Sequence, residues 1–181
     1  MNATFKIVPV PQGRKKIINA LLGILLLMMA ALPVAVLSSG WSKPVMAVGA
    51  SVIILLALAQ YFLMWIDGSD KVTYTVTGEH LRVAGDAFFT RTVPRGKIRA
   101  GEAKILNLHQ DREYALGLRV GGTGLFYYNA GWFLMGNRER VFACVTDPTR
   151  VVYLPVEGEP ALLLTVDRPE ELIQSLRAVS G

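Results

Sequence analysis

The chain contains few of the residues that catalytic or disulfide-rich proteins depend on. It has one cysteine, Cys144, and two histidines, His80 and His109. A single cysteine excludes an internal disulfide and is compatible with a reducing compartment. Two histidines match a tetrahedral metal site poorly, even with Asp111 and Glu113 close to His109. No nucleophile–base pair can be read from the spacing, so we expect no enzyme activity, no metal and no cofactor.

Charge is also scarce, and it is unevenly distributed. Charged residues make up 18% of the sequence, and the net charge is +5. Residues 67–181 hold 14 basic and 14 acidic residues, so their net charge is zero. The surplus comes from five cations near the N-terminus: Lys6, Arg14, Lys15, Lys16 and Lys43. A basic cluster beside an apolar run determines membrane topology, so the composition argues against nucleic-acid binding.

Charge is missing altogether from two long apolar runs. Ile17–Leu37 and Val45–Ile66 hold 21 and 22 residues without Asp, Glu, Lys, Arg or His, and Ser38–Pro44 separates them. An α-helix of that length reaches about 30 Å, the thickness of a bilayer's hydrocarbon core. The runs therefore predict a hairpin of two transmembrane helices. Cleavage of the first run as a signal peptide is the alternative, although its apolar stretch is longer than usual for one.

The orientation of this hairpin follows from the basic cluster that precedes it. Lysine and arginine beside a span are retained on the cytoplasmic side, so both termini are expected in the cytoplasm, at the cell inner membrane. The chain then has three parts: a basic tail (1–16), the hairpin (17–66, with spans 17–37 and 45–66) and a cytoplasmic domain (67–181).

Small residues recur four positions apart near the outer ends of both spans. They form two pairs that permit close helix packing, within the chain or in a larger complex: Ala31 with Ala35, and Ala47 with Ser51. The spans contain no ionisable group of the kind that lines ion pathways. We therefore expect an anchor rather than a pump or channel.

From Val72 onward, short β-rich runs alternate with turn residues. Val72–Thr77 alternates apolar residues with threonine, a period of two that is typical of a half-buried strand. Gly121–Gly131 is predicted to be a loop. The remaining predicted strands are Leu81–Ala84, Phe88–Val93, Ile105–Leu108, Leu116–Val120, Trp132–Met135, Arg140–Val145, Val151–Pro155 and Ala161–Thr165. This succession predicts an antiparallel β domain, a partly open barrel or sandwich.

The last segment predicts an amphipathic helix that covers the open end of this sheet. Asp167, with Glu170 three residues later, has the spacing of a capping box, and Pro169 suits the first helical turn. Apolar residues fall on one face of the helix, namely Leu172, Ile173, Leu176 and Val179.

Several segments of this domain resemble the bacterial pleckstrin-homology (PH) domains of small membrane proteins. They are Gly117–Gly124, Ala130–Phe133, Val141–Pro148 and Val151–Pro155. The resemblance covers residues 72–179 and implies a PH-like fold, with no catalytic residues to carry over. Eukaryotic PH domains hold phosphoinositides with a basic motif in their first hairpin. Here that turn is Gly78–His80, which is short and not basic.

Two groups of residues are candidates for contact with the membrane or a partner. The basic group comprises Arg91, Arg95, Lys97, Arg99 and Lys104, and an acidic group within Glu157–Glu171 would make the domain a dipole. The aromatic group is Phe126, Tyr127 and Tyr128, which either folds inward or meets a surface. The neighbouring Gly121–Gly124 lacks the Gly-Lys-Ser/Thr ending of a phosphate loop, and we interpret it as a turn.

These observations predict a non-catalytic PH-like binding module tethered to the membrane. It would engage a protein partner or the inner-leaflet surface, at the high effective concentration that a short tether provides. The alternative is a structural role, as an accessory subunit or homo-oligomer that packs through its hairpin.

Overall fold

The computed structural model describes residues 3–10, 72–84, 90–125 and 128–178, together with scattered helical positions between residues 13 and 57. The chain divides into two units, Met1–Val10 with Gly68–Gly181, and Pro11–Asp67. Within the described part of the chain, none of the helices has both the length and the apolar composition that a bilayer crossing requires.

The predicted spans fall mostly outside the described residues. The same is true of three of the predicted packing residues, Ala31, Ala35 and Ala47, whereas Ser51 belongs to a described helical stretch at residues 51–54.

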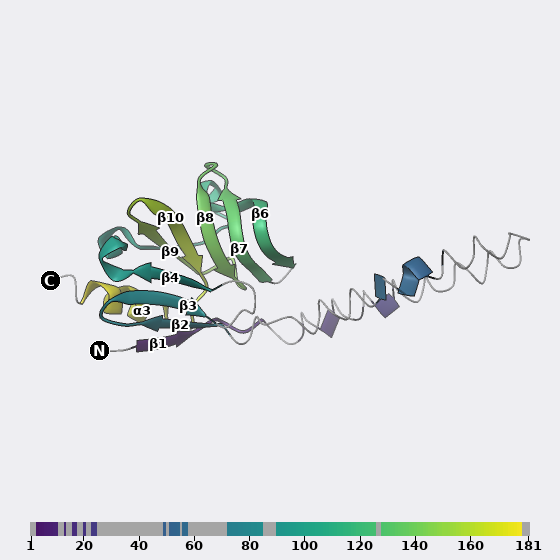
Figure 1. Cartoon of the computed structure of the whole chain (residues 1–181), viewed down its shortest axis with the longest axis horizontal. Coiled ribbons are helices and arrows are strands. Elements are labelled where there is room, and N and C mark those ends of the chain that lie inside the picture. The colour runs from purple at the N-terminus through teal and green to yellow at the C-terminus, as the bar shows by residue number, and fades with distance from the viewer. Residues whose placement is uncertain are drawn as a thin grey trace, which may run out of the picture. The chain divides into compact units, whose positions relative to one another are not determined.

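The first sheet of the β domain has four antiparallel strands (Figure 1). They pair in chain order: β1 (Ala3–Lys6), β2 (Thr73–Val76), β3 (His80–Ala84) and β4 (Arg91–Pro94). In β2 the side chains of Tyr74 and Val76 are buried and the threonines between them are half-buried, which confirms the predicted alternation. One face of this sheet therefore packs against the rest of the domain.

Strand β1 is a departure from the predicted domain boundaries. Its register places Lys6 opposite Thr73, and the backbone N–H of Ile7 donates to the carbonyl oxygen of Val72 at 3.2 Å. Phe5 and Ile7 are each only 3% exposed. The first ten residues therefore belong to the β domain, not to the predicted tail. A four-residue strand whose partner lies beyond residue 70 leaves no local periodicity to detect.

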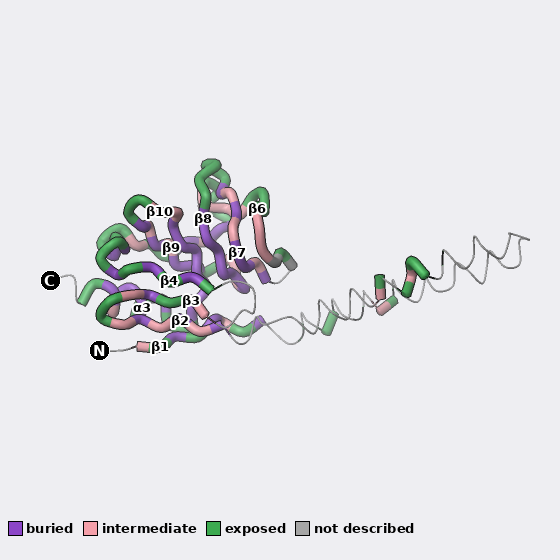
Figure 2. Tube along the Cα trace, in the orientation of Figure 1, coloured by how far each residue is buried: buried purple, intermediate pink, exposed green. Residues whose placement is uncertain are grey.

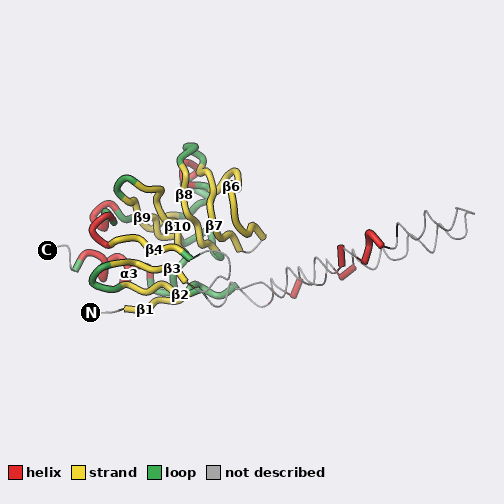
Figure 3. Tube along the Cα trace, in the orientation of Figure 1, coloured by secondary structure: helices red, strands yellow, loops and turns green. Residues whose placement is uncertain are grey.

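The second sheet has six strands and is curled, with the order β5-β9-β10-β8-β7-β6 (Figure 3). Its strands are β5 (Lys104–Leu106), β6 (Leu116–Leu125), β7 (Tyr128–Met135), β8 (Arg140–Val145), β9 (Val151–Val156) and β10 (Glu159–Leu164). Three short 3₁₀ helices lie in the connections of the described domain: η2 (Arg95–Lys97), η3 (Ala100–Glu102) and η4 (Arg112–Tyr114). The α-helix α3 (Pro169–Arg177) follows β10.

The prediction of a purely antiparallel domain is wrong at one position. Strand β10 pairs with β8 in parallel, with Ala161 opposite Val141 and Leu164 opposite Cys144. β10 also pairs with β9 as the second strand of a hairpin, so it lies between two neighbours. Leu162, for example, is fully buried. A continuous apolar run such as Ala161–Leu164 is typical of a strand buried on both faces, and it carries no signal for strand direction.

The predicted loop over Gly121–Gly131 is also wrong, because strands β6 and β7 continue through it. Gly122 lies opposite Gly131 in this hairpin, and both have positive φ, 129° and 122°. A Cβ atom on Gly122 would lie 2.2 Å from the carbonyl oxygen of Ala130. The glycines thus allow the two backbones to approach closely, whereas the sequence pattern of glycine suggested a turn.

The apolar core is divided between the two faces of the curled sheet (Figure 2). One cluster draws on five strands of that sheet and the loop after β5: Leu106, Leu108, Phe133, Met135, Val141, Ala143, Val145, Val151, Ala161 and Leu163. Helix α3 buries Leu172, Ile173 and Leu176, which confirms the predicted apolar stripe over the described residues. Burial of each such side chain stabilises the fold by about 1.5–3 kcal/mol.

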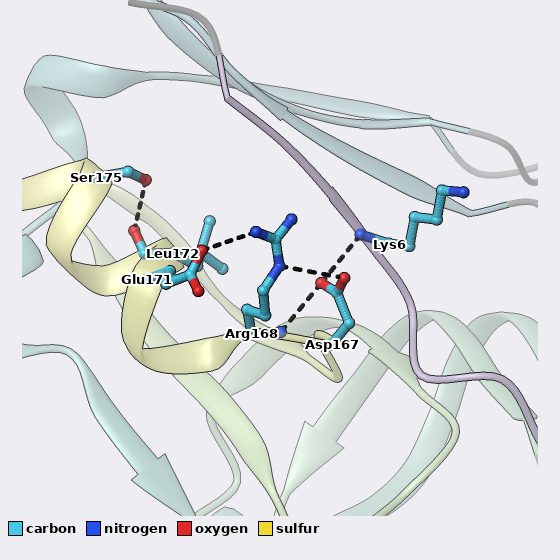
Figure 4. Close-up of polar contacts among 6 residues, drawn as sticks. All are labelled: Lys6, Asp167, Arg168, Glu171, Leu172 and Ser175. Atoms are coloured by element: carbon cyan, nitrogen blue, oxygen red, sulfur yellow. Dashed lines mark hydrogen bonds and ion pairs between the residues drawn. The ribbon is translucent and has the colours of Figure 1, made fainter.

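The predicted capping role of Asp167 is wrong. The residue that precedes the first turn of α3 is Arg168, and no side chain caps the helix there. The carboxylate of Asp167 instead accepts hydrogen bonds from the backbone N–H of Lys6 at 3.2 Å and of Arg168 at 3.0 Å (Figure 4). Its own N–H donates to the carbonyl oxygen of Lys6 at 2.9 Å. The hydrogen bonds of Asp167 therefore link β1 to the start of α3.

Candidate functional site

One end of the β domain, which we name the exit end, is where the chain leaves toward residues 11–67 and returns. The strand register defines it, because Lys6 lies opposite Thr73, and Thr73 lies opposite Ala84. Arg91, at the start of β4, lies opposite Val83 and therefore belongs to the same end. Both ends of the segment 11–67 thus meet the domain at neighbouring backbone positions.

The second sheet contributes its own turn to the exit end. The hydroxyl of Thr146, which follows β8, donates to the carbonyl oxygen of Val8 at 2.7 Å. Val145 lies opposite Asn129 near the start of β7, and Tyr128 lies opposite Leu125. The facing ends of β6 and β7, at Leu125 and Tyr128, are therefore at the exit end, on the side of the domain toward which β1 runs in Figure 1.

Two of the predicted contact residues, Arg91 and Arg95, are buried instead of presented to a surface. The Arg91 guanidinium lies over Trp132, 4.8 Å from the ring centroid. It donates to the carboxylate of Glu159 at 3.3 Å and to the carbonyl oxygen of Pro160 at 3.0 Å. Burial lowers the pKa of Arg91, and the hydrogen bond to Glu159 opposes that shift. The prediction of a contact role is corrected for both arginines.

Arg95 joins the first sheet to the C-terminal end of α3. Its guanidinium donates to the carbonyl oxygen of Thr77 at 3.0 Å, to that of Leu176 at 3.1 Å, and to that of Ser175. The last carbonyls of a helix have no partner within the helix and carry partial negative charge. The buried guanidinium of Arg95 therefore has a structural role, because it caps the C-terminal end of α3.

The remaining basic candidates are exposed, but acidic neighbours accompany two of them. Lys97 pairs with Glu159 at 2.7 Å, and Arg99 lies 3.9 Å from Glu157. The hydrogen bond from Lys97 is the largest cause that lowers the pKa of Glu159. Lys104 lies 5.9 Å from the ring of Tyr114. The basic segment and the acidic β9–β10 turn are therefore side by side, so the predicted charge dipole is wrong here.

These charged turns gather around the β9–β10 turn, which we name the far end, and Arg91 of the exit end also reaches this turn through Glu159 at 3.3 Å. There the backbone N–H of Glu157 donates to the carbonyl oxygen of Lys97 at 2.8 Å, and Ile98 bridges to Val156. The β7–β8 turn, residues 136–139, lies at this end too, because β8 runs from Arg140 back toward the exit end.

The predicted aromatic group is split by its position in the fold. Tyr128 is 1% exposed at the start of β7, so its side chain folds inward. Phe126 and Tyr127 lie outside the described residues. They join the two strand ends that the register places at the exit end.

The described residues offer no arrangement typical of catalysis. Among them no three His, Cys, Asp or Glu side chains converge on a metal position, and Cys144 is 2% exposed. Gly121–Gly124 lies in strand β6, so its interpretation as a turn is wrong. An open depression of about 510 Å³ lies over the β9–β10 turn, where Glu159 is already engaged by Lys97.

Sequence reasoning missed an exposed apolar position on the outermost strand of the second sheet. Leu118 and Val120 in β6 are 70% and 50% exposed. The pairing of β6 with β7 is irregular on both sides of Arg119, between Leu116 and Gly121. Irregular pairing turns side chains of an edge strand outward. The Leu-x-Val spacing was visible in the sequence, but only the structure shows that nothing among the described residues covers it.

Comparison of the chain with family models, with curated proteins and with solved structures finds no match. The structure itself defines a mostly β domain of one antiparallel and one mixed sheet, which ends in a helix.

Tyr74 provides a prediction about how this domain is held together. Its hydroxyl, on a fully buried ring, donates to the carbonyl oxygen of Thr165 at 3.1 Å and thereby joins the two sheets. Burial raises the pKa of Tyr74 well above its ordinary value. Replacement with phenylalanine is expected to lower the free energy of unfolding by about 1 kcal/mol near neutral pH.

The raised pKa of Tyr74 also predicts how the free energy of unfolding changes at alkaline pH. Below about pH 10 the hydroxyl keeps its proton in both states, and the stabilisation is complete. Above that pH the unfolded chain releases the proton while the native chain retains it, so the free energy of unfolding falls. Denaturant titrations of the full chain should show a smaller loss of stability at alkaline pH for Tyr74→Phe than for wild type. Equal slopes would contradict this assignment.

Proposed function

We propose that this protein is a membrane-anchored, non-catalytic binding module, whose β domain is held at the inner-membrane surface by the apolar segment between β1 and β2. The single observation that carries the proposal is the pairing of β1 with β2. It brings the start and the end of the segment to neighbouring positions, joined by the hydrogen bond from Ile7 to Val72.

This pairing restricts what the apolar segment can do. Residues on both of its sides are in one folded domain, so they lie on the same side of any membrane that the segment enters. The number of crossings is then even, and two uncharged runs of 21 and 22 residues suit two crossings. The basic residues Arg14, Lys15 and Lys16 before the first run favour a cytoplasmic domain, with both termini cytoplasmic.

The binding part of the proposal concerns strand β6. Exposed Leu118 and Val120 form an apolar contact point for a protein partner, and their burial on binding would be favourable. A tether of a few residues keeps this contact point at high effective concentration beside other membrane proteins, so a small surface is sufficient. The PH-like assignment is part of the same proposal, and the support for it is the β-rich domain that ends in a helix.

The anchoring can be tested by impermeant thiol labelling of intact cells. In a Cys144→Ala background, Ser39→Cys lies in the turn between the runs, and Glu157→Cys lies on an exposed turn of the domain. We expect only the Ser39→Cys variant to be labelled before lysis, and both variants to react after it. Labelling of Glu157→Cys in intact cells would reverse the orientation. Release of the chain by carbonate would refute the anchoring.

The partner can be tested by a photo-crosslinking amino acid placed in the full chain in native membranes. Position 118 is the test, and Thr92, exposed on β4 of the other sheet, is the matched control. A discrete adduct from position 118 that is lost on Val120→Ser supports a protein partner. Adducts with the mass of a second copy would favour the structural alternative. Equal yields from positions 118 and 92 would contradict the proposal.

A further inference from the structure

Strand β6 is one edge of the second sheet, and it differs from the other edge strands of the described domain (Figure 1). It is ten residues long, from Leu116 to Leu125, and it contains no proline. The other edge strands, β1, β4 and β5, have four, four and three residues, and β4 ends at Pro94. Short edge strands and proline discourage pairing with another chain. Among the described edges, β6 is therefore the one best suited to receive a further strand.

The backbone of β6 can supply the hydrogen bonds for such a strand. In an antiparallel pair, part of the N–H and C=O groups of each strand point at the partner, and the rest point to the other side. Residues 121–125 pair one-to-one with β7, from Gly121 opposite Trp132 to Leu125 opposite Tyr128. Among the described residues, the backbone groups of this half have no backbone partner outside β7. The regular half of β6 therefore presents a row of unused donors and acceptors.

The first half of β6 adds apolar side chains to this edge. The pairing with β7 is irregular on both sides of Arg119, and all four residues of Gly117–Val120 are exposed. Leu118 is 70% exposed and Val120 is 50% exposed. A strand that pairs with the regular half and continues along the edge would reach both side chains. Their burial would then favour binding.

Arg119 indicates the charge that an added strand should carry. Its side chain is exposed and forms no ion pair with any residue that the structure describes. A Cβ atom added to Gly124 would lie 3.1 Å from the Nη1 atom of Arg119. The guanidinium therefore lies beside the regular half of the strand, in space that glycine leaves open. A carboxylate on an added strand would form a charge-assisted hydrogen bond with it there.

A second copy of β6 does not meet this requirement. Leu116–Leu125 contains no aspartate or glutamate, so two copies paired edge to edge would bring two Arg119 side chains together without a carboxylate. Like charges on paired strands are destabilising. A lipid headgroup, in turn, offers no row of alternating donors and acceptors. An extended segment of a different protein, with a carboxylate among apolar side chains, meets both requirements.

Resting on the proposed function of β6 as a binding surface, we infer that the partner adds an extended segment to this edge, as a seventh strand of the six-stranded second sheet. The backbone of this segment pairs with Gly121–Leu125, and an Asp or Glu side chain pairs with Arg119. Its apolar side chains pack beside Leu118 and Val120. Main-chain hydrogen bonds then provide affinity, whereas the side chains provide specificity.

Titration of the full chain with fluorescently labelled peptides can test strand addition. The probe is an eight-residue peptide of alternating valine and threonine, with glutamate in place of one threonine. Its matched control is the same peptide methylated on two consecutive backbone nitrogens. Consecutive N–H groups of a strand point to opposite edges, so the methyl groups block pairing on both edges and retain the side chains. We expect the control to bind at least about tenfold more weakly.

Amide hydrogen exchange of the full chain can locate the bound probe. We expect slower exchange in residues 117–125 when the probe is bound, because the outer N–H groups of β6 gain acceptors. The opposite edge of the same sheet, β5 (Lys104–Leu106), should exchange at an unchanged rate. Protection of β5 with no protection of β6 would contradict the assignment of the edge.

Charge reversal can test the place of the carboxylate. Wild type should bind the glutamate probe about two- to fivefold more tightly than the same peptide with lysine at that position. Arg119→Glu should reverse this preference. Lys104→Glu is the matched control, since Lys104 is an exposed cation on the opposite edge, and it should leave the preference unchanged. Equal binding of the two peptides by wild type would refute the pairing of a carboxylate with Arg119.

Three results would overturn strand addition while leaving the proposed function intact. Equal binding of the methylated and unmethylated probes would mean that β6 binds through its side chains alone. Absence of probe binding, in a chain that still gives a discrete adduct from position 118, would mean that the partner covers the strand without pairing. A dimer of the full chain that Leu118→Ser dissociates would mean that a second copy occupies the edge. Absence of both probe binding and the adduct would instead refute β6 as the binding surface.

Discussion

Replacement of Arg95 with methionine is expected to lower the free energy of unfolding of the β domain by about 3–5 kcal/mol. Arg95 is 7% exposed, and its guanidinium donates to carbonyl oxygens of Thr77, Ser175 and Leu176. Methionine fills much of the same volume but donates no hydrogen bond. Three carbonyl groups then lose their partner, and each buried polar group left unpaired costs about 1–3 kcal/mol.

The helix adds to this effect, because its C-terminal carbonyls attract a cation. We therefore expect α3 to detach before the sheets unfold, as faster amide exchange in residues 172–177 than in β10. Thermal unfolding of the full chain measures the loss of stability. Arg95→Lys should recover part of it, since an ammonium group cannot reach all three carbonyls from a single position.

The matched control is Arg99→Met in the same segment. Arg99 is half exposed, and its distances to Glu102 and Glu157 are 3.7 and 3.9 Å. Exposed ion pairs contribute about 0–1 kcal/mol, so this variant should unfold close to wild type. Equal stabilities of the two variants would refute the structural role of Arg95 and would reopen the interpretation of the basic group as a surface.

Replacement of Gly131 with alanine is expected to lower the free energy of unfolding by about 3 kcal/mol or more. The residue has a φ of 122°, a conformation that side chains rarely adopt. An added Cβ would lie 2.4 Å from the carbonyl oxygen of Gly121 and 2.8 Å from the Cα of Gly122. Both neighbours are backbone atoms of the paired strand, so the hairpin must open to relieve the clash.

Gly121→Ala serves as the control, because a Cβ at that position meets nothing within 4 Å. It should change stability little, although it lies in β6, the strand that pairs with β7. Unfolding of both variants is monitored by near-ultraviolet circular dichroism of the full chain. The comparison distinguishes local strain at Gly131 from the general effect of replacing a glycine with alanine. A Gly131→Ala chain as stable as Gly121→Ala would show that the two strands are not paired as described.

The elements that could be predicted from the sequence are those that local pattern specifies. Alternation in Val72–Thr77 gave β2, the turn at Gly136 and Asn137 separated β7 from β8, and the apolar stripe from Leu172 gave α3. In each case the residues that decide the structure lie within a few positions of one another. Periodicity then reports directly which face is buried.

The candidate site was harder to predict, because the charge of a side chain does not show whether it is buried or exposed. Arg91 and Arg95 look like surface cations in the sequence, yet one stacks on Trp132 and the other closes a helix end. Trp132 lies 41 positions from Arg91, and Leu176 lies 81 positions from Arg95. Leu118, by contrast, looks like a core residue and is 70% exposed, because the pairing of β6 is irregular there.

The two uncharged runs, the neutral β-rich region after them and the final amphipathic helix can all be recognised in the sequence alone. Three other features are visible only in the folded domain: Ala3–Lys6 forms an edge strand of the first sheet, β10 pairs with β8 in parallel, and Asp167 binds the backbone of Lys6. The first set depends on neighbours along the chain, whose spacing the helix and strand periods fix. The second depends on pairings between distant segments, which are selected by the packing of the whole domain.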